Sequence, residues 1–257
     1  MTYRKADLYG ILNGIDYEVW SPRTDPDLPA HFSADDPSGK AKCKAALQQE
    51  MGLPVDAHVP VFGLVTRLSA QKGLDLLDAV LPAMLQKEAL QVVILGTGDQ
   101  YFHDMLTKLA VAHPDKLAVS LKFDNALAHR IFGGSDAFLM PSHYEPCGLG
   151  QMISLAYGTV PVVRATGGLA DSVKESRRPN NGGVHNGGNG FSFEPYTSRA
   201  LKMAMNRAMT CFADAPCWRE IMAHAFQSDF SWEASARQYM KAYESAIAHA
   251  RTRPVGV

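Results

Sequence analysis

The sequence predicts an α/β fold in which helices cover both faces of a parallel sheet. Two observations predict it: short apolar runs recur along the chain, and the stretches between them carry apolar residues at three- and four-residue spacing. Runs that are apolar on both faces are typical of buried parallel strands, and the intervening spacing is typical of helices with one buried face. With 257 residues, 46% of them hydrophobic, the chain is long and apolar enough to form such a core.

Each expected strand is short, apolar and followed by a turn signal. The clearest are 59–65, 91–95, 117–121, 137–140 and 159–163, and a shorter strand follows at 190–193. Helical spacing occurs between 74 and 85, between 105 and 110, and at 197–212, 216–226 and 231–250. Two other segments, 13–40 and 176–190, are rich in turn-forming residues, and we expect the second to be a mobile surface loop.

Charge and cysteine content limit the classes of partner. The 25 basic and 26 acidic residues give a formal net charge of −1, so the chain has no cationic excess for a nucleic acid or an anionic membrane. Cys43, Cys147, Cys211 and Cys217 are too irregularly spaced for a disulfide framework or a zinc site, so we expect four reduced thiols and no metal. Neither a signal peptide nor a membrane-spanning run is found, which favours a cytoplasmic protein.

Four loops follow expected strands, at the sheet edge where parallel α/β proteins bind ligands. The cation loop, residues 66–73, carries Arg67 and Lys72 ahead of a helix, so it is either an anion site or a solvated basic turn. The GTGD loop, residues 95–99, is an incomplete dinucleotide fingerprint, and we interpret it as a tight turn with Asp99 capping the next helix.

The other two loops carry a carboxylate and a glycine pair. In the glutamate loop, residues 141–151, Glu145 either binds sugar hydroxyls and offsets developing positive charge, or caps a helix. In the TGG loop, residues 164–172, the Thr166 hydroxyl and the amides of Gly167 and Gly168 precede a helix and form a neutral phosphate cradle. Together the loops could hold a diphosphate without a metal.

These residues resemble a known family. RLSAQKG, LGTGD, HYEPCGLGQ, VPVVRATGGLADS, NGFSF and LNGIDYEVWSP together resemble the bacterial glycogen synthases and plant starch synthases that use ADP-glucose. The resemblance extends from about Leu8 to about Tyr243 and implies the C-terminal, Rossmann-like half of a GT-B glycosyltransferase, whose N-terminal domain this sequence lacks. It implies an inter-domain linker at 1–22, a nucleotide-sugar domain at 23–230 and, at 231–257, a helix that crosses back to the missing domain.

The resemblance also implies an activity. It is the retaining transfer of glucose from ADP-glucose to the non-reducing end of an α-1,4-glucan, with no cofactor. The site residues then divide by role. Arg67 and Lys72 neutralise the leaving ADP, while Thr166, Gly167 and Gly168 bind its phosphates and Phe123 stacks on adenine. Glu145 faces the glucosyl ring, and the amides around Cys147, Gly148 and Leu149 hold its hydroxyls.

Some positions depart from the family pattern or leave alternatives open. Gly150 replaces a threonine common in the family, and Ile153 stands where many related enzymes have a second glutamate. We expect His129 and His143 to be structural, whereas Gln151 either touches the sugar or makes a buried helix contact.

Two further functions stay open from the sequence. The chain could be a non-catalytic nucleotide- or glucan-binding module, for which the apolar stripe from Trp232 to Ile247 would be a binding surface. It could also belong to a glycosyltransferase that uses another nucleotide-sugar. A difference between ADP and UDP binding separates an enzyme that uses another nucleotide-sugar from one that uses ADP-glucose.

Overall fold

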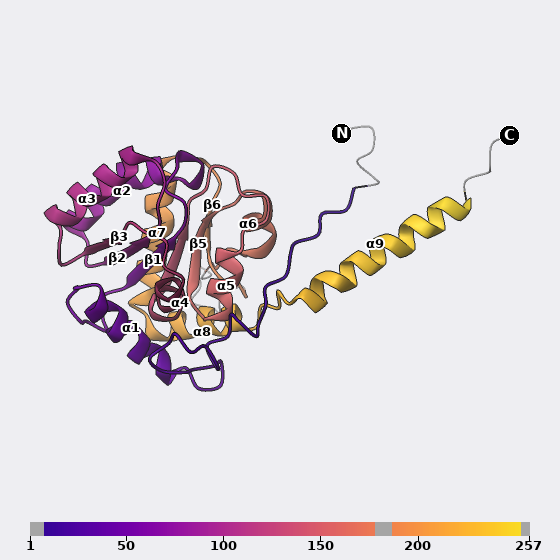
Figure 1. Cartoon of the computed structure of the whole chain (residues 1–257), viewed down its shortest axis with the longest axis horizontal. Coiled ribbons are helices and arrows are strands. Elements are labelled where there is room, and N and C mark those ends of the chain that lie inside the picture. Colours follow the sequence, from indigo (N-terminus) through magenta and orange to yellow (C-terminus); the bar gives the residue numbers. More distant parts are fainter. Residues whose placement is uncertain (1–7, 178–186, 253–257) are drawn as a thin grey trace.

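Six strands run parallel in one sheet, in the order β3-β2-β1-β4-β5-β6 (Figure 1). The computed structural model describes residues 8–177 and 187–252. The strands are β1 (Val61–Val65), β2 (Gln91–Leu95), β3 (Leu117–Ser120), β4 (Ala137–Met140), β5 (Val160–Arg164) and β6 (Phe191–Phe193). All six expected strands are confirmed to within two residues at each end; the largest difference is at the first, which begins at Val61 instead of Val59. The expected loop at 176–190 falls largely on residues 178–186, which lie outside the described residues.

Helices cover both faces of the sheet, as expected. The helices are α1 (Ser38–Glu50), α2 (Leu74–Lys87), α3 (Gln100–Ala112), α4 (Asn125–Gly134), α5 (Gly150–Ala156), α6 (Gly167–Ser172), α7 (Ser198–Phe212), α8 (Ala215–Phe226) and α9 (Trp232–Thr252), with a 3₁₀ turn at Ala70–Lys72. Helices α2, α3 and α7 pack on one face, while α1, α4 and α5 pack on the other. The result is a three-layer α/β domain.

The strands show why their sequence runs are apolar throughout. In β1, Phe62 and Leu64 contact the core on the α2 side, whereas Val61 contacts the core on the α1 side. Neighbouring side chains of a strand point to opposite faces, so a sheet covered on both sides needs apolar residues at every position.

Two helices, α1 and α4, were not predicted. In α1 the buried face includes Lys40, Lys44 and Gln48, so it has no apolar stripe to detect. In α4 the helix is short and ends in two glycines, and it begins where the Asp124 carboxylate accepts a hydrogen bond from the Leu127 N–H at 2.9 Å.

The expectation of four reduced thiols is wrong. Cys211, near the end of α7, forms a disulfide with Cys217, near the start of α8, and their Cα atoms are 5.4 Å apart. The tight corner between the two helices produces this spacing, which suits a disulfide. Cys43 and Cys147 are free thiols.

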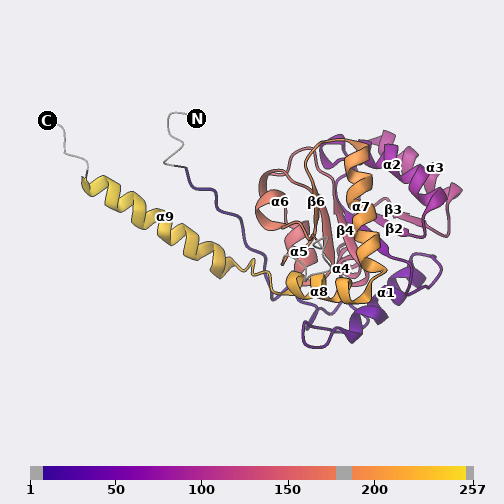
Figure 2. The ribbon, with the colours of Figure 1, turned by 180° about the vertical axis from the view of Figure 1, so that it is seen from behind.

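Helix α9 leaves the rest of the domain, and the segment before Ile15 runs beside it (Figures 1 and 2). Ser235 Oγ donates to the Leu12 carbonyl at 2.7 Å, and the hydroxyls of Tyr9 and Ser245 are also 2.7 Å apart. The stripe expected on this helix is uncovered: its large apolar side chains are 40–60% exposed, namely Trp232, Tyr239, Met240, Tyr243 and Ile247. None of the described helices is both long and apolar enough to cross a bilayer.

Candidate functional site

The strand order places a ligand-binding crevice between β1 and β4. The chain builds outward from β1 to β3 in one direction and from β4 to β6 in the other, so the loops after β1 and β4 diverge there. The cation loop follows β1 and the glutamate loop follows β4, while the GTGD and TGG loops follow β2 and β5. All four loops singled out in the sequence therefore lie at the same edge of the sheet.

Lys72 and Glu145 meet at this crevice. The lysine Nζ donates to Glu145 Oε2 at 2.5 Å, and the side chains are only 18% and 9% exposed. Ser142 Oγ donates to the same carboxylate oxygen at 3.2 Å. The carboxylate is thus held in one orientation by a cation and a hydroxyl, and it is not a helix cap.

The main chain of Glu145 connects the glutamate loop to the TGG loop. Its carbonyl accepts a hydrogen bond from the Gly168 N–H at 3.0 Å, and the Pro146 carbonyl is 3.2 Å from the same nitrogen. Gly167 has a φ of +47°, and a Cβ there would collide with the Glu145 carbonyl. The glycines therefore allow close contact between the loops, and the Gly168 amide, expected to face a phosphate, already has an acceptor.

The remaining donors of the TGG loop suit an anion. Thr166 is the N-cap of α6, in extended conformation, and its hydroxyl makes no capping bond. The Gly167 N–H follows it at the first position of the helix, where N–H groups have no acceptor within the helix. A hydroxyl and an amide are thus available beside the Lys72–Glu145 pair.

Arg67 and Phe123 line one cleft of about 340 Å³ next to the crevice. Phe123 is 88% exposed, and it precedes the N-cap Asp124, which also pairs with Lys122 at 2.9 Å. An exposed ring at a helix start can stack on a planar group. The cleft is lined in addition by Trp20, Phe132, Gly150 and Ile153.

The GTGD loop supports the cation loop. The Leu68 N–H donates to the Thr97 carbonyl at 3.0 Å, and the Asp99 N–H donates to the Leu68 carbonyl at 2.8 Å. Asp99 is the N-cap residue of α3, as expected, but its side chain makes no capping bond; His103 Nε2 instead accepts from the Gly98 N–H at 3.1 Å.

The residues that carry the expected sugar-binding amides are partly exposed. Leu149 is 49% exposed and Cys147 is half-buried. Gln151, which follows them, is fully buried and donates to main-chain oxygens of the loop. Of its two alternatives, the structure shows the buried contact.

Neither histidine joins the site through its ring. The His143 ring packs 4.5 Å from Tyr196, while its carbonyl accepts from Arg164. His129 stacks on Trp20 at 4.0 Å, and its Nδ1 is 2.8 Å from Asp25 Oδ2. Both are structural, as expected.

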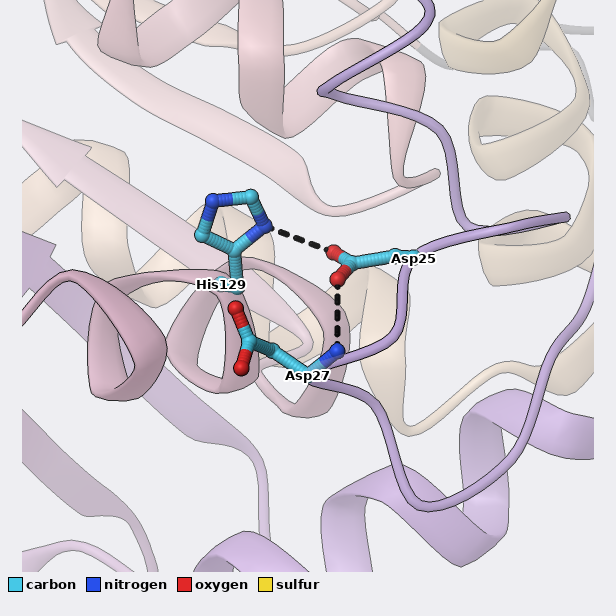
Figure 3. A group of neighbouring side chains, drawn as sticks. All are labelled: Asp25, Asp27 and His129. Carbon is cyan, nitrogen blue, oxygen red and sulfur yellow. Dashed lines mark hydrogen bonds and ion pairs between the residues drawn. The ribbon is translucent and has the colours of Figure 1, made fainter.

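Asp25, Asp27 and His129 are close enough to hold a metal (Figure 3). The oxygens of Asp25 are, however, already used: Oδ2 accepts from Tyr157 and pairs with His129, and Oδ1 accepts from the Asp27 N–H at 2.9 Å. Burial and the neighbouring carboxylate raise the pKa of Tyr157, so its hydroxyl stays a donor. The cluster is a buried hydrogen-bond network.

Sequence reasoning missed Ser142 and Tyr196. Ser142 lies three residues before Glu145, a spacing that could have identified it. Tyr196 donates to Asp75 Oδ1 at 2.5 Å and stacks under the Arg164 guanidinium at 5.3 Å, contacts between distant segments that no local pattern reveals. Burial and the bond to Asp75 raise the pKa of Tyr196.

Comparison with known proteins identifies relatives of this chain. Residues 52–215 match the family model described as glycosyl transferases group 1. Glycogen synthases from Anaeromyxobacter dehalogenans (strain 2CP-1) and Moorella thermoacetica are 52% and 50% identical over 95% of this chain, which covers 50% and 49% of their lengths. The chain thus spans about half of these relatives.

A solved structure is similar over nearly the whole chain. The catalytic domain of starch synthase IV from Arabidopsis thaliana, bound to ADP and acarbose, superposes with a TM-score of 0.85 at 35% identity, covering 96% of this chain and 50% of that one. Both the family model and the similar structure therefore agree on the family and the fold of this chain. The chain belongs to the group 1 glycosyl transferases and has the Rossmann-like fold of the C-terminal domain of a GT-B enzyme.

Proposed function

We propose that this chain is the donor-binding domain of a glycogen synthase, which transfers glucose from ADP-glucose to the non-reducing end of an α-1,4-glucan with retention of configuration. The observation that carries the proposal is the Lys72–Glu145 pair at the β1/β4 crevice, next to the donors of the TGG loop. The starch synthase IV that it resembles was solved with ADP and acarbose bound, which supports both the nucleotide and the glucan.

In this proposal the cations act on the leaving group. The bond between the anomeric carbon and the β-phosphate oxygen breaks as the acceptor hydroxyl forms the new glycosidic bond, and the proton of that hydroxyl passes to the departing phosphate. Arg67 and Lys72 then offset the charge that develops on ADP. The Thr166 hydroxyl and the Gly167 amide bind the phosphates, Gly168 lets the loops approach, and Phe123 stacks on adenine.

The glutamate loop acts on the sugar. Glu145 lies beside the glucosyl ring, where its negative charge stabilises an oxocarbenium-like transition state. The main-chain amides around Cys147, Gly148 and Leu149 bind the sugar hydroxyls. Because Glu145 is fixed by Lys72 and Ser142, it needs little reorganisation when the donor binds.

We also propose the division of the chain into a linker at 1–22, a nucleotide-sugar domain at 23–230 and a crossing helix at 231–257. The uncovered stripe of α9 supports this division, because a row of exposed aromatic side chains on a projecting helix suits packing against a companion domain. Catalysis would then need that N-terminal domain, with the acceptor bound between the two, in the cytoplasm.

Calorimetric titration of this chain with ADP and UDP tests the proposal. We expect ADP to bind, UDP to bind more weakly, and Arg67→Ala to lose roughly 1.5–3 kcal/mol of ADP binding through a missing charge-assisted contact. Arg23→Ala is the control, because Arg23 is an exposed arginine that pairs with Asp35. If ADP does not bind, or if Arg67→Ala binds as tightly as Arg23→Ala, the proposed site is wrong; a preference for UDP indicates another nucleotide-sugar.

A further inference from the structure

Gln151, the last residue of the glutamate loop, contacts both this loop, which the proposed function assigns to the sugar, and the TGG loop, which it assigns to the diphosphate. Its side chain is fully buried. The amide nitrogen donates to the carbonyls of Cys147 and Gly148, at 3.0 and 3.1 Å, and to Ser172 Oγ in α6 at 3.1 Å. One amide thus contacts the glutamate loop and Ser172, the last residue of the TGG loop.

Ser172 extends this connection into the TGG loop. Its hydroxyl donates to the Gly168 carbonyl at 2.6 Å, which leaves its lone pairs to accept from Gln151. The Gly168 N–H in turn donates to the Glu145 carbonyl. Together with the main chain from Glu145 to Cys147, these hydrogen bonds form a closed ring that passes through both loops.

The ring fixes the direction of the expected sugar-binding amides. In a trans peptide the C=O and the next residue's N–H point in opposite directions. Because Gln151 holds the carbonyls of Cys147 and Gly148, the N–H groups of Gly148 and Leu149 are turned away from it. Gly148 has a φ of +73°, and a Cβ there would collide with Gln151 Oε1, so the loop backbone and this side chain fit each other.

The geometry of Gln151 differs from that of a glutamine that serves stability alone. Its Oε1 is buried and has no partner among the described residues, which costs free energy. Gln48, at the opposite edge of the sheet, is equally buried but uses both ends: Nε2 donates to Asp56 and Gln91, and Oε1 accepts from the Asp56 N–H. Gln151 is placed for its donor bonds to the two loops.

We propose that Gln151 is a positioning residue that couples the TGG loop to the glutamate loop, so that a diphosphate bound at the first orders the sugar-facing amides of the second. The coupling rests on the proposed function. Gln151 touches neither ligand and acts through the main chain of residues 147–149 and through Ser172.

Amide hydrogen exchange on the whole chain tests the coupling, with and without ADP. The variants are Gln151→Met and Ser172→Ala, which remove the donor and the hydroxyl, and Gln48→Met is the matched control. Without ligand, we expect Gln151→Met to speed exchange about fivefold at both residues 147–149 and Gly168, and Gln48→Met to leave both loops unchanged.

With ADP, the wild-type chain should gain protection in both loops. In Gln151→Met the protection by ADP should be confined to the TGG loop, and ADP binding should weaken about five- to tenfold. In the double variant, Ser172→Ala should weaken ADP binding little further, because both changes break the same connection. The coupling is overturned if ADP still protects residues 147–149 in Gln151→Met, or if the unliganded loops exchange as in wild type. Absence of ADP binding to the wild type contradicts the proposed function instead, and the unliganded comparison still decides the role of Gln151.

Discussion

The sheet carries a buried lysine–carboxylate pair at each of its two edges. At the carboxyl edge Lys72 pairs with Glu145, with 18% and 9% exposed side chains. At the amino edge Lys44 pairs with Asp136 at 2.8 Å, with 8% and 11% exposed side chains. By distance and burial the two pairs are nearly alike, so their surroundings must distinguish their roles.

The surroundings differ in what else each pair contacts. At the amino edge the main chain completes the pair: Asp136 Oδ2 accepts from the Val61 N–H, and Lys44 donates to the Ala57 carbonyl. At the carboxyl edge the pair lies among loops whose other donors, such as the Thr166 hydroxyl, have no capping role. A buried ion pair therefore indicates a ligand site only when unsatisfied donors surround it.

Removal of the Asp136 carboxylate, at the amino edge, should have the largest effect on stability. Asp136→Ala leaves Lys44 and the Val61 N–H buried without their partner, and we expect it to lower the free energy of unfolding by about 3–5 kcal/mol. Urea denaturation measures this. The control is Asp35→Ala, an exposed ion-pair partner that should cost less than about 1 kcal/mol. Equal effects of the two variants would show that the amino-edge pair is not structural.

The carboxyl-edge lysine should affect binding as well as stability. Lys72→Met should weaken ADP binding by roughly 1.5–3 kcal/mol, and it should lower the free energy of unfolding by less than Asp136→Ala does, because Glu145 keeps the Ser142 hydroxyl as a partner. Calorimetry measures the ADP affinity, and urea denaturation of the same sample measures the free energy of unfolding. A large loss of stability with unchanged ADP affinity would reverse the assignment of the two edges.

Lys40 sharpens the comparison through pH. Burial lowers its pKa to about 8, although Nζ donates to Gly133, Tyr157 and Thr159. Because the unfolded chain holds this proton up to about pH 10.5, stability should rise between pH 8 and 10.5, by about 2 kcal/mol from pH 7.5 to 9.5.

The pH effect is read as a difference between two proteins. Lys40→Met lacks the titrating group. Between pH 7.5 and 9.5 the free energy of unfolding of wild type should therefore rise by about 2 kcal/mol more than that of Lys40→Met. Parallel curves for the two proteins would mean that Lys40 titrates normally in the fold.

Phe123 should give the smallest effect. The ring is exposed, so Phe123→Ala should leave stability unchanged and weaken ADP binding by roughly 1 kcal/mol through loss of stacking. Val111→Ala, at another exposed apolar side chain, should change neither quantity. If the Phe123 variant binds ADP like wild type, the cleft lined by Arg67 and Phe123 does not hold the base.

The sequence predicted the apolar part of the fold better than its polar part. The strands could be located because each is an uninterrupted apolar run with helices between. Helix α1 could not, since its buried face uses Lys40 and Lys44, whose burial is possible only with acceptors from distant segments. The Cys211–Cys217 disulfide depends in the same way on a corner between helices that spacing alone does not define.

The candidate site, too, could be predicted from the sequence only in part. Lys72 and Glu145 could be singled out because each occupies a loop after an expected strand, and parallel strands bring such loops to one edge. The engagement of the Gly168 amide and the ring through Gln151 could not be predicted. They depend on contacts between the two loops, which the residues of either loop alone do not specify.

The two ends of the described chain leave the domain side by side. The Ile15 N–H donates to the Phe230 carbonyl at 2.8 Å, and from there the segment through Leu12 and α9 run out together. Anything joined to the chain through these two segments is therefore connected to the domain at a single place.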